Sequence, residues 1–183
     1  MPSRIIWTIG HSTRPIQDFL ALLQAHGIRH LMDVRTIPRS RHNPQFNTEA
    51  LRRSLKLAGL GYVHAGELGG LRKPTRDSFN LGWKNASFRG YADYMQTAAF
   101  WNALDELMAT GREQPTAIMC AEAVPWRCHR SLIADALLTR GCGVRHIMTP
   151  DRADEHRLTS FAKIEGSRLS YPAPADDDAP RLF

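Results

Sequence analysis

The sequence predicts a single α/β domain, built on a mostly parallel sheet of about five strands with helices on both faces. Three features carry this prediction. Short apolar runs alternate along the chain with segments whose apolar residues recur at helical spacing. Strands that alternate with helices are typical of a parallel sheet. The length of 183 residues, with 43% hydrophobic residues, is enough for one core.

The elements follow one another in a regular order. The predicted strands are residues 4–9, 30–34, 61–64, 116–119 and 144–148. The predicted helices are residues 15–26, 48–58, 91–110 and 129–140. Pro15 suits a first helical turn, and Gly27 and Gly59 are typical of the positions just after a helix.

Two segments fall outside this alternation. Residues 68–89, after the third predicted strand, form one long excursion with Gly, Pro, Asn and Ser among polar residues. Loops of that length are usually functional or mobile. The domain is expected to span residues 1–165, and residues 166–183 are expected to be a flexible tail. The acidic residues 176–178 leave open that the tail folds back onto a basic surface.

The composition restricts the cellular location and the partners that we expect for the protein. No apolar run approaches the ~20 residues needed to cross a bilayer, and the start of the chain lacks the apolar segment of a signal peptide. Three cysteines are too few for a disulfide scaffold. We therefore expect a cytoplasmic protein that does not bind membranes. The net charge of +6 fits either a solvated basic surface or an anionic partner, which is a small molecule, a nucleotide or a nucleic acid.

Polar residues gather at one edge of the predicted sheet. Ligands of parallel α/β sheets bind beyond the carboxyl ends of the strands. The first three predicted strands deliver there His11, Ser12, Asp33, Arg35, Arg39, Ser40, Arg41, His64, Glu67, Gly69 and Gly70. The fourth delivers Cys120, Glu122, Arg127, Cys128, His129 and Arg130. The opposite edge is poorer in such residues, which makes the Cys120 edge the expected functional edge.

Five separated motifs on these segments resemble one known family. They are residues 8–12 (TIGHS), 33–41 (DVRTIPRSR), 68–70 (LGG), 91–95 (YADYM) and 120–130 (CAEAVPWRCHR). Together they resemble, from about Ile5 to Ile147, the uncharacterised family catalogued as domain of unknown function 488. The resemblance implies an α/β domain whose biochemical activity is not established, and some members carry a DNA-repair label.

Cys128 is the residue whose surroundings best fit a reactive thiol. It lies at the start of a predicted helix, between Arg127 and His129. Helix N-termini and nearby cations lower a thiol pKa from about 8.5 to roughly 3.5–7.5. This predicts a partly ionised nucleophile or one half of a Cys–His pair, with Cys120, Glu122 and the general base His11 completing the catalytic set. The alternative is a small buried residue at the helix start.

Two other interpretations of residues 120–130, which we call the cysteine loop, are disfavoured. A cysteine at a strand end resembles Cys-based phosphatases and rhodaneses, but their C-x5-R spacing would place the arginine at Trp126. The loop also contains Glu122 and no glycine, which makes it a poor anion cradle. A mixed Cys/His metal site would use Cys120, Cys128 and His129, with His11, His64 or Glu122 as a further ligand, but the spacing is not a zinc signature. No cofactor or metal is therefore predicted.

Arginines at the same edge predict an anion-binding site. Guanidinium groups suit bidentate contacts with phosphate and carboxylate. The predicted substrate-binding residues are Ser12, Arg35, Arg39, Arg41, Gly69, Gly70, Arg127 and Arg130. Two simpler interpretations remain open, in which Asp33 neutralises Arg35 and Glu122 neutralises Arg130.

Two functions remain open from sequence. The favoured one is a hydrolase or transferase with Cys/His chemistry, acting on a phosphate-bearing or nucleotide-like anion. The alternative is a non-catalytic nucleic-acid-binding protein with a basic rim and an aromatic-rich excursion. In that alternative Trp83, Phe88, Tyr91 and Tyr94 would stack on bases near Arg72, Lys73 and Arg76. The same aromatic residues could instead pack the excursion onto the core. The sequence does not indicate an oligomeric state.

Overall fold

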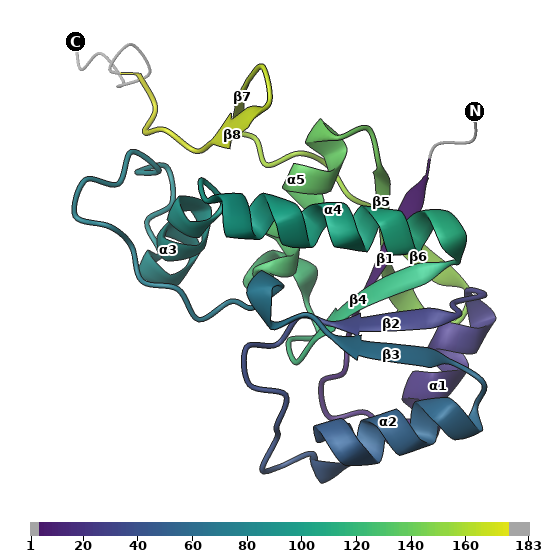
Figure 1. The fold of residues 1–183 in the computed structure, drawn as a ribbon. Helices are drawn as coiled ribbons and strands as arrows, with labels where there is room; N and C mark the ends of the chain where they lie inside the picture. Colours follow the sequence, from purple (N-terminus) through teal and green to yellow (C-terminus); the bar gives the residue numbers. More distant parts are fainter. Residues whose placement is uncertain (1–3, 176–183) are drawn as a thin grey trace, which may run out of the picture.

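A six-stranded sheet forms the centre of the fold (Figure 1). The computed structural model describes residues 4–175. The strand order is β3-β2-β4-β1-β5-β6. The strands are β1 Ile5–Gly10, β2 His30–Asp33, β3 Gly61–His64, β4 Thr116–Cys120, β5 Gly143–Thr149 and β6 Arg152–Glu155. The first five strands are parallel and β6 is antiparallel to β5. The predicted fold class is confirmed, with one strand more than expected.

Helices cover both faces of the sheet, as predicted. They are α1 Ile16–Ala25, α2 Thr48–Leu57, α3 Ala86–Tyr94, α4 Ala98–Glu113 and α5 Arg130–Thr139. Alternate residues of β4 point to opposite faces. Ile118 and Cys120 pack with α3, α4 and α5, whereas Ala117 and Met119 pack with α1 and α2. The thiol of Cys120 therefore belongs to the same layer as α5.

The helix predicted over residues 91–110 is two helices. Asn85 begins α3, where its side chain accepts hydrogen bonds from two backbone N–H groups. Thr97 begins α4, and its hydroxyl accepts from the N–H of Phe100. The apolar spacing runs on across the break because both helices pack on the same core. Thr97, an N-cap residue inside the predicted segment, was the sequence signal for the break.

The excursion and the C-terminal segment are held against the body. The hydroxyls of Tyr91 and Tyr94 donate to the carbonyls of Leu68 and Glu67. The segment expected to be a flexible tail includes β8 Arg168–Ser170, which forms a hairpin with β7 Lys163–Glu165. Tyr171, which follows β8, is fully buried. The acidic residues 176–178 lie outside the described residues.

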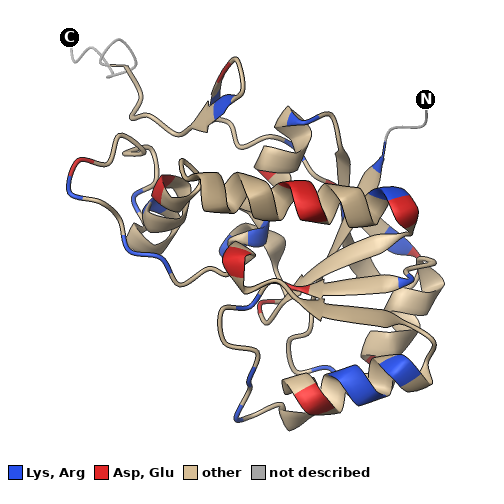
Figure 2. Cartoon of the chain, in the orientation of Figure 1, with Lys and Arg blue, Asp and Glu red and all other residues tan. Residues whose placement is uncertain are grey.

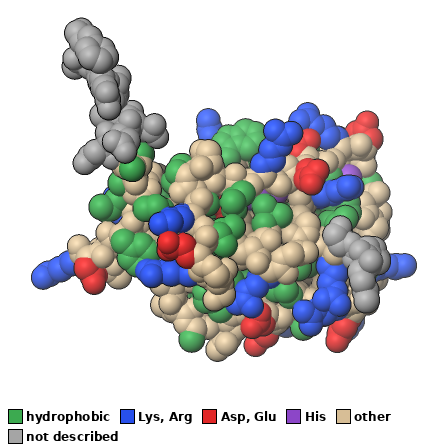
Figure 3. Space-filling view, turned by 90° about the horizontal axis from the view of Figure 1, so that it is seen from above, with side chains coloured by type: hydrophobic (Ala, Val, Ile, Leu, Met, Phe, Trp, Pro, Cys, Tyr) green, Lys and Arg blue, Asp and Glu red, His purple; other side chains and the backbone are tan. Residues whose placement is uncertain are grey.

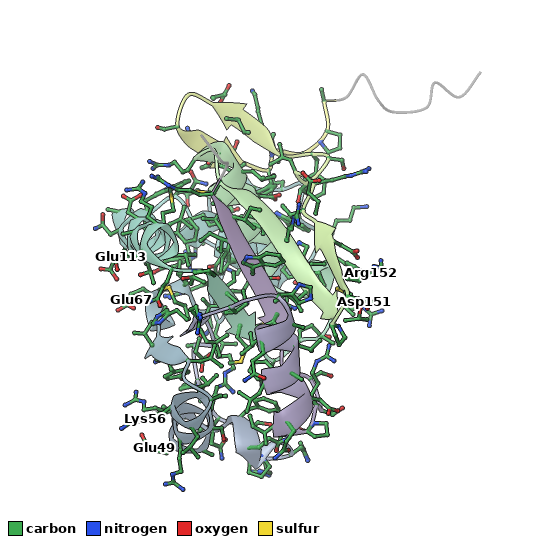
Figure 4. All side chains as sticks on the ribbon, turned by 90° about the vertical axis from the view of Figure 1, so that its right-hand side faces the viewer. Glu49, Lys56, Glu67, Glu113, Asp151 and Arg152 are labelled. Atoms are coloured by element: carbon green, nitrogen blue, oxygen red, sulfur yellow. The ribbon has the colours of Figure 1, made fainter. Side chains whose placement is uncertain are left out.

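Charged side chains lie mainly at the periphery. Figure 4 labels examples on α2 and at the outer end of β6, and all of the labelled side chains are exposed. None of the helices within residues 4–175 is long and apolar enough to cross a membrane.

Gly10 allows the cysteine loop to lie across the end of β1. The N–H groups of His11 and Ser12 donate to the carbonyls of Cys120 and Ala121, both at 2.9 Å. A Cβ atom on Gly10 would overlap the carbonyl group of Glu122. The close approach of the β1 end and the cysteine loop therefore requires glycine.

We predict that Gly10→Ala destabilises the fold by about 1–3 kcal/mol, because the added methyl group forces the loop away from β1. Thermal unfolding should show a melting temperature lower by several degrees. Gly143→Ala is the control, since a Cβ there would meet its nearest atom at 3.6 Å, an ordinary contact. Equal melting temperatures for the two variants would contradict this account of Gly10.

Candidate functional site

A cavity of about 350 Å³ opens at the carboxyl edge of the sheet. Its wall combines apolar side chains of the excursion and the β2 loop with charged side chains. The lining residues are Arg35, Thr36, Ile37, Arg39, Gly70, Leu71, Ser87, Phe88, Cys120, Ala121, Glu122, Arg127, Cys128 and His129. Figure 2 shows Lys and Arg on the loops around this edge. The functional edge expected from sequence therefore has a cavity.

Two thiols lie in contact at the base of this cavity. The Sγ atoms of Cys120 and Cys128 are 2.6 Å apart. Cys120 ends β4, and Cys128 follows the short helix η3 Pro125–Arg127 just before α5. Arg130 reaches back from the first turn of α5, donating from Nε to Cys120 Sγ at 3.0 Å and from its backbone N–H to Cys128 Sγ at 3.5 Å. Both thiols therefore contact Arg130, Cys120 through the buried guanidinium and Cys128 through the backbone N–H.

The two thiols differ in acidity. Burial alone would raise the pKa of Cys128, but a hydrogen bond from Cys120 and the charge of Arg130 outweigh it and lower the pKa to about 7. Burial and the hydrogen bond to Cys128 raise the pKa of Cys120. Near pH 7 about half of the Cys128 thiols are therefore ionised, and the proton of Cys120 is directed toward the thiolate.

His129 is oriented to exchange a proton with Cys128. Its Nε2 lies 3.0 Å from the carbonyl oxygen of Val34, which can only accept, so Nε2 carries the proton. Nδ1 then presents a lone pair 3.4 Å from Cys128 Sγ. Burial lowers the pKa of His129, which favours the neutral imidazole. A Cβ on Gly70 would lie 2.6 Å from Nδ1, so a larger residue at position 70 would displace the ring.

Arg35 is held by an ion pair at the cavity wall. Its Nε and one terminal nitrogen donate to Asp33, at 2.9 and 2.7 Å, and both side chains are buried. Its other terminal nitrogen lies 3.4 Å from His11 Nε2. His11 stacks on Phe46 and does not line the cavity. His11 therefore supports Arg35 in this geometry, and Asp33 is the anchor of that arginine.

The structure brings eight of the thirteen predicted site residues to the cavity wall. The eight are Arg35, Arg39, Gly70, Cys120, Glu122, Arg127, Cys128 and His129. The others are His11, Ser12, Arg41, Gly69 and Arg130, none of which lines the cavity. Arg130 lies below it, fully buried, and binds the backbone carbonyl of Glu122 rather than its carboxylate. The alternative left open from sequence, in which Glu122 neutralises Arg130, is therefore wrong.

A metal site is not formed by the described residues. Within residues 4–175 no group of three or more His, Cys, Asp and Glu side chains is arranged to hold a metal ion. The mixed Cys/His set considered from sequence is not arranged as such a group.

A buried polar network behind the thiols was missed from sequence. Arg130 donates to the hydroxyl of Thr8 at 3.0 Å, and this hydroxyl lies 2.7 Å from His146 Nδ1. His146 Nε2 lies 3.0 Å from His156 Nδ1. His156 Nε2 lies 2.8 Å from a carboxylate oxygen of Asp135. Because the Thr8 hydroxyl accepts from Arg130, its own proton points to His146 Nδ1. Each imidazole ring of the network therefore accepts at Nδ1 and donates from Nε2. The network ends where the hydroxyl of Tyr171 donates to Asp135.

We predict that His146 makes the fold acid-sensitive. Burial and the neighbouring His156 and Arg130 charges lower the pKa of His146 to about 3, whereas an unfolded histidine titrates near 6.5. Between these values the unfolded state binds more protons, so the free energy of unfolding falls with falling pH, by up to about 1.4 kcal/mol per unit. Urea unfolding from about pH 7 to pH 4.5 measures this slope.

His146→Gln should have a shallower slope than the wild type. The exposed-site control His42→Gln should keep the wild-type slope, and equal slopes for the two variants would contradict the prediction.

Comparison with known proteins places the chain in a family. No curated protein and no solved structure shows a significant match to it. The family model described as domain of unknown function DUF488 matches residues 15–137, which is more than half of the chain and includes the second β-strand, the cysteine pair and most of α5. The chain belongs to the DUF488 family.

Proposed function

We propose that this protein is a hydrolase or transferase that acts on a phosphate-bearing or nucleotide-like anionic substrate, with Cys128 as the nucleophile. One observation carries the proposal. The cavity places a thiol with a pKa of about 7 beside an imidazole lone pair, below a wall that contains three arginines. A cytoplasmic setting belongs to the proposal, because a thiolate nucleophile needs reducing surroundings.

The proposed chemistry uses the Cys128–His129 pair. The thiolate attacks an electrophilic carbon or phosphorus, a bond to sulfur forms, and the bond to the leaving group breaks with its electron pair. His129 Nδ1 accepts the thiol proton and returns it to the leaving group. Water or a second substrate then displaces the Cys128 adduct. The anionic part of the substrate is held by Arg39 and Arg127 and by the anchored guanidinium of Arg35.

Side chains, rather than backbone N–H groups, would bind the anion. The carbonyl oxygens of Glu122 and Ala123 point toward Arg130, at 2.6 and 3.4 Å from its terminal nitrogen. This part of the cysteine loop therefore presents acceptors and not donors toward its interior. The geometry supports the preference, made from sequence, against a phosphatase-type cradle.

A small anion fits the surroundings better than a nucleic acid strand. Trp83 packs edge-on against Phe88 and Phe161, with ring centroids 5.0 and 4.8 Å apart. Tyr91 is fully buried, and Arg72 stacks over the ring of Tyr94. On the face shown in Figure 3, Lys and Arg side chains are separated by hydrophobic and acidic ones. These aromatic rings support the interpretation in which the excursion packs onto the core.

We predict that iodoacetamide modifies Cys128 with a half-maximal rate near pH 7. The thiolate is the reacting form, so the rate should fall as pH drops below that value. Cys142 is an internal control, because burial raises its pKa. Peptide mass spectrometry after short labelling pulses distinguishes the two residues. A midpoint for Cys128 at or above that of Cys142 would contradict the proposed nucleophile.

We also predict that inorganic phosphate and mononucleotides raise the melting temperature of the protein. Replacing Arg39 or Arg127 by Gln should abolish the shift, because each contributes a guanidinium to the cavity wall. Arg152→Gln is the control, since this exposed arginine pairs with Asp154 outside the cavity. A shift that survives both cavity substitutions would show that the anions bind elsewhere.

A further inference from the structure

We propose that Cys120 and Cys128 are also a redox couple, which reduces small disulfides bearing carboxylate groups and thereby closes into an intramolecular disulfide. This activity is separate from the proposed hydrolase or transferase chemistry, although both use Cys128. The observation that carries it is the 2.6 Å separation of the two Sγ atoms. A disulfide bond is about 2.05 Å long, so bond formation needs a movement of only about half an ångström.

The surroundings assign different roles to the two sulfurs. Cys128 is the attacking thiol, because it faces the cavity beside His129 and is the more acidic of the two. Cys120 is the resolving thiol. It lies at the end of β4, where Arg130 Nε donates to its sulfur and would stabilise a thiolate formed there. An attacking and a resolving thiol in contact are what disulfide reduction requires.

The substrate class follows from the cavity. Its apolar wall, formed by Ile37, Leu71 and Phe88, and its volume of about 350 Å³ suit a small organic molecule. Arg39 and Arg127 on the same wall suit carboxylates. A peroxide would need neither feature. We therefore favour a small disulfide with negatively charged groups on both halves.

The reaction balances as two thiol–disulfide exchanges. The Cys128 thiolate attacks one substrate sulfur, and the first half leaves as a thiolate that takes up a proton. Cys120 then loses its proton to His129 and attacks Cys128 Sγ, which expels the second half as a thiol. Two protein thiols and one substrate disulfide give one protein disulfide and two small thiols. A dithiol reductant returns the protein to its starting state.

Cys142 provides a control within the same chain. It is also buried, but it directly precedes β5 at the opposite end of the strands. It makes no sulfur contact with the other two cysteines, all three of which are free. Burial of a cysteine in this protein therefore does not by itself produce a pair.

The test compares two disulfides of similar size and opposite charge, dithiodipropionate and cystamine. Dithiodipropionate should oxidise the reduced protein at least about tenfold faster, because the arginines concentrate anions at the cavity. The intact mass should fall by about 2 Da. Trypsin cleaves after Arg127, so peptides 113–127 and 128–130 should remain joined until a reductant is added. Equal rates for the two reagents would overturn the assigned substrate charge.

Two variants separate this inference from the proposed nucleophile. Cys120→Ser should stop at the mixed disulfide, with one substrate half attached to Cys128, and Cys142→Ser should behave as the wild type. The serine hydroxyl can still donate to Cys128, so alkylation near neutral pH should persist in Cys120→Ser. If Cys128 is alkylated near pH 7 but no bond to Cys120 forms, the redox inference fails and the nucleophile stands. A disulfide that involves Cys142 would also overturn the inference.

Discussion

The buried guanidinium of Arg130 is the constraint on which the site depends. Arginine stays charged inside proteins, and a buried charge without a compensating partner is costly. Within the described residues its hydrogen-bond partners are the Cys120 sulfur, the Thr8 hydroxyl and two backbone carbonyls, with no carboxylate among them. The compensating charge that the cysteine pair can supply is the Cys128 thiolate, which forms near pH 7. The fold thus favours an ionised thiol at neutral pH.

The same guanidinium connects the site to strand β5 on the face of the sheet that α5 covers. Thr8 of β1 accepts from Arg130 and donates to His146 of β5, so two neighbouring strands and the first turn of α5 are held in one hydrogen-bonded unit. His146 donates in turn to His156, and His156 donates to Asp135, which lies on α5 itself. The network leaves α5 at its first turn and returns to it, which fixes the helix start that positions Cys128.

Sequence periodicity predicted the sheet, and the predicted strand ends indicated the edge at which the cavity lies, because both depend on local pattern. The features that the sequence did not predict depend on contacts between segments far apart in the chain. Arg130 was assigned to substrate binding because guanidinium groups suit anions, yet it is buried below the cavity. β6 was missed because an edge strand carries no apolar run. The link from His146 through His156 to Asp135 was missed because it joins segments that no sequence spacing relates.

In the proposed scheme Cys128 serves both as the nucleophile of the hydrolase or transferase and as the attacking thiol in disulfide reduction. The oxidation state of the Cys120–Cys128 pair decides whether the nucleophile is available. A Cys120–Cys128 disulfide removes the nucleophilic thiolate, so hydrolase or transferase turnover would stop while the bond persists. It also removes the negative charge nearest to Arg130, whose hydrogen bonds to Thr8 and to the loop carbonyls do not replace it. The oxidised state therefore carries an uncompensated buried cation, which raises its free energy and makes the disulfide easier to reduce. A labile disulfide of this kind suits a protein that must regain its thiolate, and it is the opposite of a structural cross-link.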